Sequence, residues 1–371
     1  MARRLAASSV AHVLLARFAP CVLDQPLRGR CPLDPRTPGR VDGVLPWRLG
    51  VKRRTRFNEG CGDLLRAVFR DWRGRPAVQV PGVSANVAPV NGSIPPDSEL
   101  GEPRAKDEER TDAGLLRDYD ILRLRAPNPG PLTLTGTNTW VVGRRPAWVV
   151  DPGPLIDDHM RKLMSAIDAR GGLGGVVLTH DHRDHSEAVE MLLEVHPAPL
   201  AAGRGRADVT LADGMRVGPF EAVQTPGHAP DHYAFIADDA CFTGDAVLGD
   251  GSVLITPHPG AMHSYLLALT GLRLREDFNV LCPGHGEVVW DAREKLEEYI
   301  GHRIDRENRL IVALNEGLRT VPDLLAAVWP EVPEELRPAA TATLAAHLDK
   351  LEDEQSLPRG VQRPSFDPDE W

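Results

Sequence analysis

Thr179-His180-Asp181-His182-Arg183-Asp184-His185 is the stretch that decides how this chain is interpreted, because it sets three imidazoles and a carboxylate at the spacing His-x-His-x-Asp-His. Three more candidate metal ligands follow, each beside glycine: His228, Asp245 and His285. Seven such donors exceed the roughly four that one tetrahedral zinc ion accepts. A shared aspartate would let them hold two neighbouring metals, which is the arrangement that activates water for hydrolysis. The sequence therefore predicts a dinuclear metallohydrolase.

The spacing also divides the ligands between the two metals. Alternate residues that leave a strand point to the same side, so the first two histidines can share one ion while the next Asp-His pair faces the other. We expect one ion at His180, His182 and His228, a second at Asp184, His185 and His285, and Asp245 as the bridge. Neutral imidazoles and carboxylates suit Zn²⁺, with Mn²⁺ or Fe²⁺ also acceptable.

The chemistry expected of this centre is hydrolysis by a hydroxide held between the metals. Such a pair of ions lowers the pKa of a water to near neutrality and stabilises negative charge on the attacked carbonyl or phosphoryl oxygen. Asp184 is the candidate catalytic residue, which would orient the hydroxide and later receive a proton. Ordinary polar loop residues are the competing interpretation, but they would suit a lone His-x-His better than a cluster followed by three further donors.

Length and composition favour a globular protein of more than one domain. The 371 residues exceed the usual size of one domain, and 42% hydrophobic with 26% charged residues is an ordinary balance. No apolar run reaches the ~18 residues that a membrane helix needs, so no membrane partner is expected. Five irregularly spaced cysteines predict no disulfide framework and favour a reducing compartment. With residue usage typical of a GC-rich bacterial genome, the predicted location is cytoplasmic; the sequence predicts no oligomeric state.

The net charge of −10 is unevenly distributed along the chain. Residues 1–80 contain 16 Lys or Arg and 6 Asp or Glu, so the remainder carries −20. A protein that binds polyanions usually shows a more basic face. The acidic balance therefore argues against tight nonspecific RNA binding by the catalytic part, with a local basic groove as the alternative.

Residues 1–112 differ from the rest of the chain in being rich in Arg, Pro and Gly with little hydrophobic periodicity. A poorly ordered or mis-annotated N-terminal extension is the preferred interpretation. A small independent fold is one alternative. The Arg- and Ser-rich first residues make a targeting segment the other.

From residue 113 onward, short strands and helices alternate, with the candidate ligands near strand ends, which favours an α/β layered fold. Strands are expected at 121–124, 139–142, 147–150, 176–178, 222–223, 233–236 and 280–281, and helices at 155–170 and 185–195. After Asp291 the pattern becomes helical, over 292–318, 320–329 and 339–351. We therefore expect a catalytic domain at 113–290, a helical domain at 291–358 and a tail at 359–371.

The order of the ligands resembles that of the metallo-β-lactamase superfamily. This resemblance implies an αββα sandwich with two zinc ions at the strand ends. The commonest class of β-lactamases carries Cys where this chain has Asp245, and the Asp instead resembles glyoxalase II-like hydrolases and RNA nucleases. Flavodiiron proteins carry Glu at the position of His182, which makes that branch a poor match.

A closer resemblance, to the β-lactamase-like protein 2 family, covers residues 120–358 and is carried by the segments 128–140, 225–232, 242–249 and 302–308. It implies endoribonuclease-like cleavage of single-stranded RNA and a C-terminal winged-helix-like domain. The first rival is hydrolysis of a thioester or lactone by the same metals, as in glyoxalase II, because the ligand set does not separate the two. The second is a non-catalytic nucleic-acid-binding or scaffold protein with a vestigial metal site, against which the complete ligand set argues.

Two further residues are predicted near the metals. His232 lies four residues after His228 and matches a family position; it is expected to support a ligand from behind, with a plain surface turn as the alternative. Asn138, in Gly-Thr-Asn-Thr, either lines the pocket or stabilises a hairpin turn.

Overall fold

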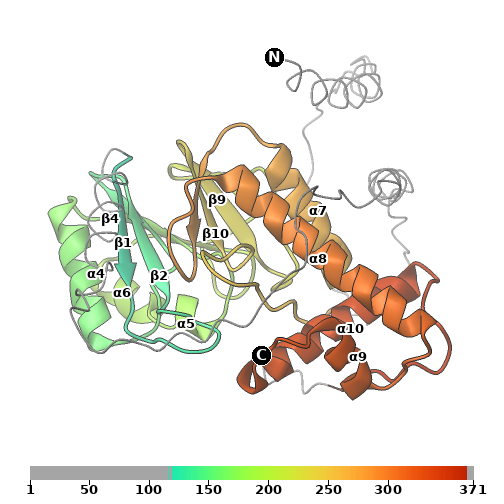
Figure 1. The fold of residues 1–371 in the computed structure, drawn as a ribbon. Coiled ribbons are helices and arrows are strands. Elements are labelled where there is room, and N and C mark those ends of the chain that lie inside the picture. Colours follow the sequence, from blue (N-terminus) through green and yellow to red (C-terminus); the bar gives the residue numbers. More distant parts are fainter. Residues whose placement is uncertain (1–115, 117–118, 366–371) are drawn as a thin grey trace, which may run out of the picture. The chain divides into compact units, whose positions relative to one another are not determined.

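The structure is a computed structural model that describes residues 116 and 119–365 of the chain. The predicted N-terminal extension, 1–112, lies outside the described residues. The described part forms one compact unit in which two β-sheets are followed by a group of helices (Figure 1).

The first sheet contains six strands in chain order, from β1 to β6. They are β1 (Ile121–Arg125), β2 (Asn138–Val142), β3 (Ala147–Val150), β4 (Leu173–Val177), β5 (Leu200–Ala202) and β6 (Val209–Thr210). The first three strands pair antiparallel, and β3 to β6 pair parallel. Because β3 and β4 are parallel, the chain must cross over between them, and the helix α4 (Asp157–Ala169) lies in this crossover.

The second sheet contains five strands in the order β11-β10-β9-β8-β7. They are β7 (Arg216–Val217), β8 (Phe220–Gln224), β9 (Tyr233–Ala237), β10 (Ala240–Gly244) and β11 (Val280–Pro283). All neighbours are antiparallel except β10 and β11, whose parallel pairing requires the crossover helix α7 (Ala261–Leu274).

The two sheets face each other across an apolar core. Trp140 of the first sheet meets Phe242 of the second edge to face, with ring centroids 5.9 Å apart, and Phe220 stands edge-on to Phe242 at 5.6 Å. On the outside of the first sheet, α4 buries Leu163 and Ile167 against the strands. Helices α7 and α8 lie beyond the second sheet (Figure 1). The αββα sandwich that the resemblance implied is thus confirmed.

The helix predicted at 185–195 is divided in the structure into α5 (Arg183–Ser186) and α6 (Val189–Val195). The division has a local cause, because the backbone N–H of Ala188 donates to the carbonyl of Gly153 at 3.1 Å instead of continuing the helix. The chain therefore turns between the two helices, and α5 is left as a short element that carries Asp184 and His185.

The C-terminal region is helical, as predicted. It contains α8 (Ala292–Asn315), α9 (Val321–Val328), the 3₁₀ helix η1 (Glu334–Leu336) and α10 (Arg337–Asp353). Asp291 and Thr320 cap α8 and α9, since each side chain accepts a hydrogen bond from a backbone N–H of the first turn. Leu310, Leu324 and Leu344 form a separate apolar core among these helices. The long helix α8 also packs on α7, so it joins this core to the sandwich.

Candidate metal centre

The seven predicted ligands lie together at the ends of four strands. The segment with His180 and His185 follows β4, and His228 follows β8. Asp245 follows β10 directly, and His285 follows β11. Their ligand atoms form three overlapping groups, each with all atoms within 4.8 Å of one another: His180, His182 and His228; His180, His185 and Asp245; and Asp184, His185 and His285.

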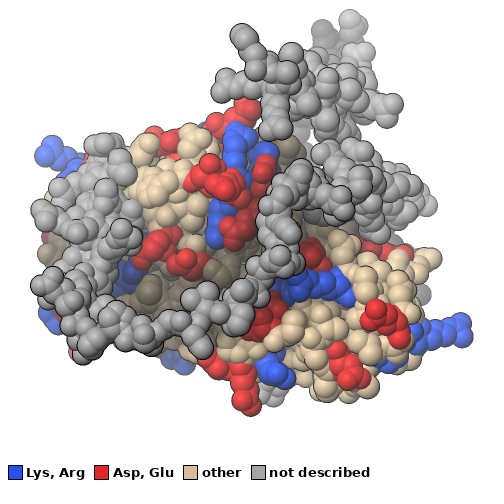
Figure 2. Space-filling view, viewed as in Figure 1, with Lys and Arg blue, Asp and Glu red and all other residues tan. Residues whose placement is uncertain are grey.

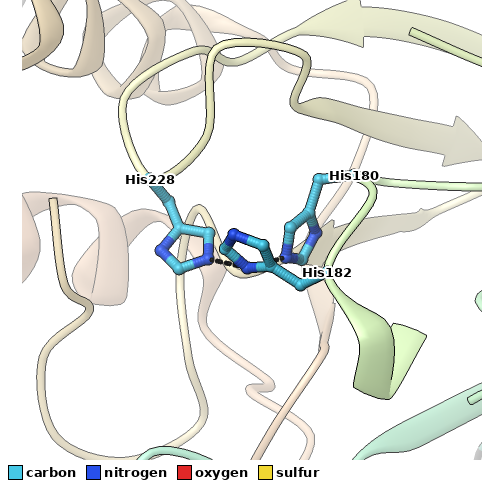
Figure 3. A group of neighbouring side chains, drawn as sticks. All are labelled: His180, His182 and His228. Carbon is cyan, nitrogen blue, oxygen red and sulfur yellow. Dashed lines mark hydrogen bonds between the residues drawn. The ribbon is translucent and has the colours of Figure 1, made fainter. Parts of the chain in front are cut away.

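In the first group, the rings of His180, His182 and His228 point toward one another (Figure 3). Nδ1 of His182 lies 2.9 Å from Nε2 of His180 and 3.0 Å from Nε2 of His228. Burial, together with the neighbouring His228 ring, lowers the pKa of His182 to about 4. The ring of His182 is therefore neutral at pH 7, which is the form that binds a metal.

Hydrogen bonds fix the proton positions on the other two rings of this group. Thr179 Oγ1 donates to Asp151 Oδ2 at 2.7 Å, so it accepts from Nδ1 of His180, 3.0 Å away. Nδ1 of His228 donates to the carbonyl of Leu254 at 2.8 Å. Both neutral rings consequently turn an Nε2 lone pair toward the third ring, whose facing nitrogen can offer only one proton. This convergence of lone pairs fits a cation.

The second group is built around the carboxylate of Asp184. Its Oδ2 lies 3.4 Å from Nε2 of His185 and 3.4 Å from Nε2 of His285, and it accepts a 2.9 Å hydrogen bond from Thr137 Oγ1. Nδ1 of His185 donates to Asp151 Oδ2 at 2.9 Å, which directs Nε2 of the ring into the group. A carboxylate and two imidazoles are again a donor set that suits zinc.

Asp245 lies between the two groups. Its Oδ1 is 3.6 Å from Nε2 of His185, while its Oδ2 is 3.6 Å from Nε2 of His228 and 3.3 Å from Nε2 of His285. Gly284 permits this approach, because a Cβ there would lie 2.4 Å from Oδ1 of Asp245. Nε2 of His185 and Oδ1 of Asp245 are buried, and the described residues offer neither a hydrogen-bond partner. Buried nitrogen and oxygen atoms that lack a hydrogen-bond partner in this way fit the ligands of a metal ion.

The electrostatics of the cluster favour positive charge at its centre. Burial by itself would lower the pKa of His185, but the carboxylates of Asp184, Asp245 and Asp151 outweigh it and raise the pKa to about 10. Burial also acts to raise the pKa of Asp245, yet the rings of His285 and His185 hold it well below its usual range. A divalent metal supplies more positive charge to these carboxylates than a proton does.

The structure places His232 behind Asp245. Its Nε2 accepts a 3.1 Å hydrogen bond from the backbone N–H of Asp245, so its Nδ1 carries the proton and donates to Thr225 Oγ1 at 2.8 Å. The ring is fully buried, which does not match the alternative of a plain surface turn. This position suits the predicted support of a ligand from behind.

Asn138 is also fully buried, at the start of β2. Its Nδ2 donates to the carbonyl of Pro283 at 3.0 Å and to that of Gly286 at 2.9 Å. Both acceptors belong to the loop that carries His285, so Asn138 braces this loop rather than a hairpin turn.

Three residues that contact the cluster were not singled out from the sequence: Asp151, Thr179 and Thr137. Asp151 is 1% exposed and is the acceptor for both Thr179 and His185. One signal was present, because Asp151 follows the apolar strand β3 directly, as Asp245 follows β10. The two threonines carry no comparable signal in the sequence.

The chain is similar to several known proteins. Residues 320–357 match the family model of the beta-lactamase associated winged helix domain. The lactamase-like protein aptB of Emericella nidulans is 30% identical over 64% of this chain and 82% of its own length. A beta-lactamase-like protein 2 homolog of Caenorhabditis elegans is 29% identical over 68% of this chain and 89% of its length. The atrochrysone carboxyl ACP thioesterase of Aspergillus chevalieri is 32% identical over 58% and 75%.

Among solved structures, a beta-lactamase domain protein from Burkholderia ambifaria is similar in fold, with a TM-score of 0.56 and 19% identity over 65% of this chain and 90% of that one. The chain thus belongs to the metallo-β-lactamase superfamily and is a metallohydrolase of that class. Its similarity to the β-lactamase-like protein 2 family and its C-terminal winged helix domain, both expected from the resemblance, are confirmed. Within residues 116 and 119–365, no helix combines the length and apolar character that a bilayer span requires.

Proposed function

We propose that this chain is a dinuclear zinc-dependent hydrolase that acts on a small ester or thioester. The observation that carries the proposal is the arrangement of seven nitrogen and oxygen donors in two groups with Asp245 between them. One zinc would be held by His180, His182 and His228, and the other by Asp184, His185 and His285. When bound, two such ions lower the pKa of a shared water and polarise the attacked carbonyl oxygen.

Asp184 is the residue best placed to move a proton during the reaction. Thr137 Oγ1 fixes its Oδ2, which faces His185 and His285. Its side chain is 28% exposed, whereas that of Asp245 is only 9% exposed. Asp184 Oδ1 can therefore accept a proton from the attacking water and pass it to the leaving group at the mouth of the site. Asp245, which is enclosed by imidazoles, is suited to holding the metals.

Charge favours a small ester or thioester over RNA as the substrate. The winged-helix region 320–357 contains eight Asp or Glu and only two Lys or Arg, and one of these two, Lys350, is 5% exposed. On the face shown in Figure 2, the visible Lys and Arg side chains are interspersed with Asp and Glu instead of forming a continuous basic surface. Binding to nucleic acid depends on cations that neutralise phosphates. The relative from Aspergillus chevalieri, named a thioesterase, adds support.

Cleavage of single-stranded RNA is the second candidate function. It is favoured by the match to a winged helix domain and by the similarity to the beta-lactamase-like protein 2 homolog. For either substrate, we propose that the chain divides into a catalytic domain at 113–290 and a C-terminal domain at 291–358.

Metal analysis of the purified protein tests the dinuclear centre. We expect about two zinc ions per chain. His182→Ala should lower this content, whereas His196→Ala should not, because His196 is a partly exposed histidine at the end of α6, outside the three ligand groups. A wild-type protein that binds no metal after zinc is supplied, or equal zinc in both variants, would refute the assignment.

A side-by-side assay tests the substrate class. Acyl thioesters, lactones and single-stranded RNA oligonucleotides would be incubated with zinc-loaded protein, and with His182→Ala as the control for contaminating hydrolases. We expect hydrolysis of a thioester or lactone that the variant lacks. Cleavage of RNA without ester turnover would instead establish the second candidate.

A further inference from the structure

We propose that the C-terminal helices form part of the support of the metal centre, and that Arg303 of α8 and Thr343 of α10 position His228 through the loop Val253–Thr256. The inference rests on the proposed role of His228 as a metal ligand. It gives the C-terminal domain a task that requires no nucleic acid.

The loop Val253–Thr256 holds His228 at two points. The carbonyl of Leu254 accepts the Nδ1 proton of the ring at 2.8 Å, and Thr256 Oγ1 donates to the backbone carbonyl of His228 at 2.6 Å. The first bond directs the Nε2 lone pair into the cluster, and the second fixes the backbone from which the ring projects. The orientation of His228 therefore depends on the position of this loop.

Thr343 reaches the same peptide unit that orients the ring. The backbone N–H of Ile255 donates to Thr343 Oγ1 at 3.3 Å, and this hydroxyl donates in turn to the carbonyl of Ala339 at 3.0 Å. The N–H of Ile255 and the carbonyl of Leu254 belong to one planar amide, so tilting one end moves the other. Ile255 is completely buried and Thr343 is 3% exposed, which leaves water little access to replace the bond.

Arg303 holds the loop one residue earlier. Its Nη2 donates to the carbonyl of Val253 at 2.5 Å, and its side chain is 2% exposed. The guanidinium stands 5.5 Å from the ring centroid of Tyr265, whose hydroxyl donates to the carbonyl of Ala246 at 2.7 Å. Ala246 directly follows Asp245, so α7 and α8 support the backbone next to a second proposed ligand as well.

These contacts form a continuous path from the C-terminal helices to the metal centre. Replacing the acceptor at Thr343 leaves a buried N–H unpaired and frees the peptide that orients His228. The expected result is looser binding of the metal that His228 helps to hold. Deleting residues 291–371 would remove Arg303 and Thr343 together, so a loss of activity in such a truncation would not by itself indicate an RNA-binding role for these helices.

The decisive experiment compares Thr343→Val with Thr341→Val in the full-length, zinc-loaded protein. Thr341 lies on the same helix and its Oγ1 also donates to a carbonyl four residues earlier, that of Arg337 at 2.7 Å. We expect zinc to pass to a chelator on the order of tenfold faster from Thr343→Val, the size of effect seen when ligand-orienting partners are removed. Thr341→Val and Thr343→Ser should match wild type, since serine retains the hydroxyl. Arg303→Met, which removes the bond to Val253 from the other helix, should also accelerate the loss.

Ring ¹⁵N chemical shifts of His228 in metal-free protein provide a second measurement. Thr343→Val should lower the population of the Nδ1–H tautomer, whereas Thr341→Val should not. Wild-type release rates in both Thr343→Val and Arg303→Met, with unchanged ¹⁵N shifts, would overturn the inference. Wild-type protein that binds no zinc would overturn the proposed function instead, and the ¹⁵N shifts would then decide the positioning of His228 alone.

Discussion

The metal centre and the contact between α8 and α10 both bury histidines beside carboxylates, yet their atoms are arranged differently. In the metal centre, ring nitrogens converge on one another and on Asp245. We call the second group the α8–α10 cluster; it consists of Glu307, His347 and Lys350. There, opposite charges lie side by side, since Lys350 Nζ is 2.8 Å from Glu307 Oε1. His347 Nδ1 is 3.5 Å from Glu307 Oε2, and burial lowers the pKa of this ring.

The difference shows which feature indicates a ligand site. Burial of charge is common to both clusters, since His185 and His347 are both fully buried. In the α8–α10 cluster, the ammonium group of Lys350 neutralises the buried carboxylate of Glu307 from within the protein. In the metal centre, two carboxylates and five imidazoles converge without a Lys or Arg among the ligand groups, an arrangement that fits a cation from outside. Variants in the metal centre should therefore lower the zinc content, whereas variants in the α8–α10 cluster should lower the free energy of unfolding and leave the zinc content unchanged.

Asp245→Asn should have the largest effect on activity. The change removes a negative charge that both proposed metals share, so we expect zinc content to fall and kcat/KM for the identified substrate to drop by a factor on the order of 10²–10³. Metal analysis and steady-state kinetics measure the two effects. The matched control is Glu307→Gln, a similar exchange in the α8–α10 cluster, which should keep both zinc ions. Full zinc content and turnover in Asp245→Asn would contradict the bridging role.

Glu307→Gln should instead reduce the free energy of unfolding. Burial alone would raise the pKa of Glu307, but contact with His347 and the charge of Lys350 outweigh it and lower the pKa to about 2. Compared with its ordinary value of 4.5, this depression corresponds to about 3 kcal/mol of stability at neutral pH.

The sign of this effect sets its dependence on pH. A carboxyl group with a depressed pKa stabilises the fold above pH 4.5 and loses this contribution as the pH falls toward 2. The difference in unfolding free energy between wild type and Glu307→Gln should therefore be largest near pH 7 and should shrink below pH 4.5. Urea denaturation of the metal-free proteins at several pH values measures it. A difference that stays constant down to pH 3 would show that the pairing with Lys350 is not its cause.

The sequence was sufficient to predict the ligands' convergence because each ligand segment follows a strand, and His228, Asp245 and His285 also stand beside glycine. Parallel and neighbouring strands bring such ends to one edge, whatever the lengths of the connections between them. The C-terminal helices were predicted for a similar reason, since the caps Asp291 and Thr320 and the apolar spacing are local. In contrast, α7 was not predicted. Its buried residues share one face, but apolar residues such as Leu267 and the exposed Leu274 also occupy the outer side, so it lacks a clear polar face.

The contacts that orient the ligands could not be predicted. Leu254 acts through its carbonyl, and Thr343 lies more than a hundred residues from His228, so no residue type or spacing identifies them. His347 was likewise not singled out from the sequence, although the structure buries it fully beside Glu307. Local patterns specify which side chains can bind a metal, whereas tertiary packing decides which of their atoms face it.

His232→Gln should have the smallest effect of these variants, because it changes a residue behind the ligands without removing a ligand. The ring accepts the backbone N–H of Asp245 and donates to Thr225, and an amide side chain cannot keep both bonds in the same geometry. We expect affinity for zinc to fall by about tenfold, with KM little changed, since His232 is fully buried and lies behind Asp245. Zinc titration against a competing chelator gives the affinity. A rise in KM at full zinc occupancy would mean that His232 contacts the substrate, and the distinction between metal-binding and supporting residues at Asp245 would then have to be redrawn.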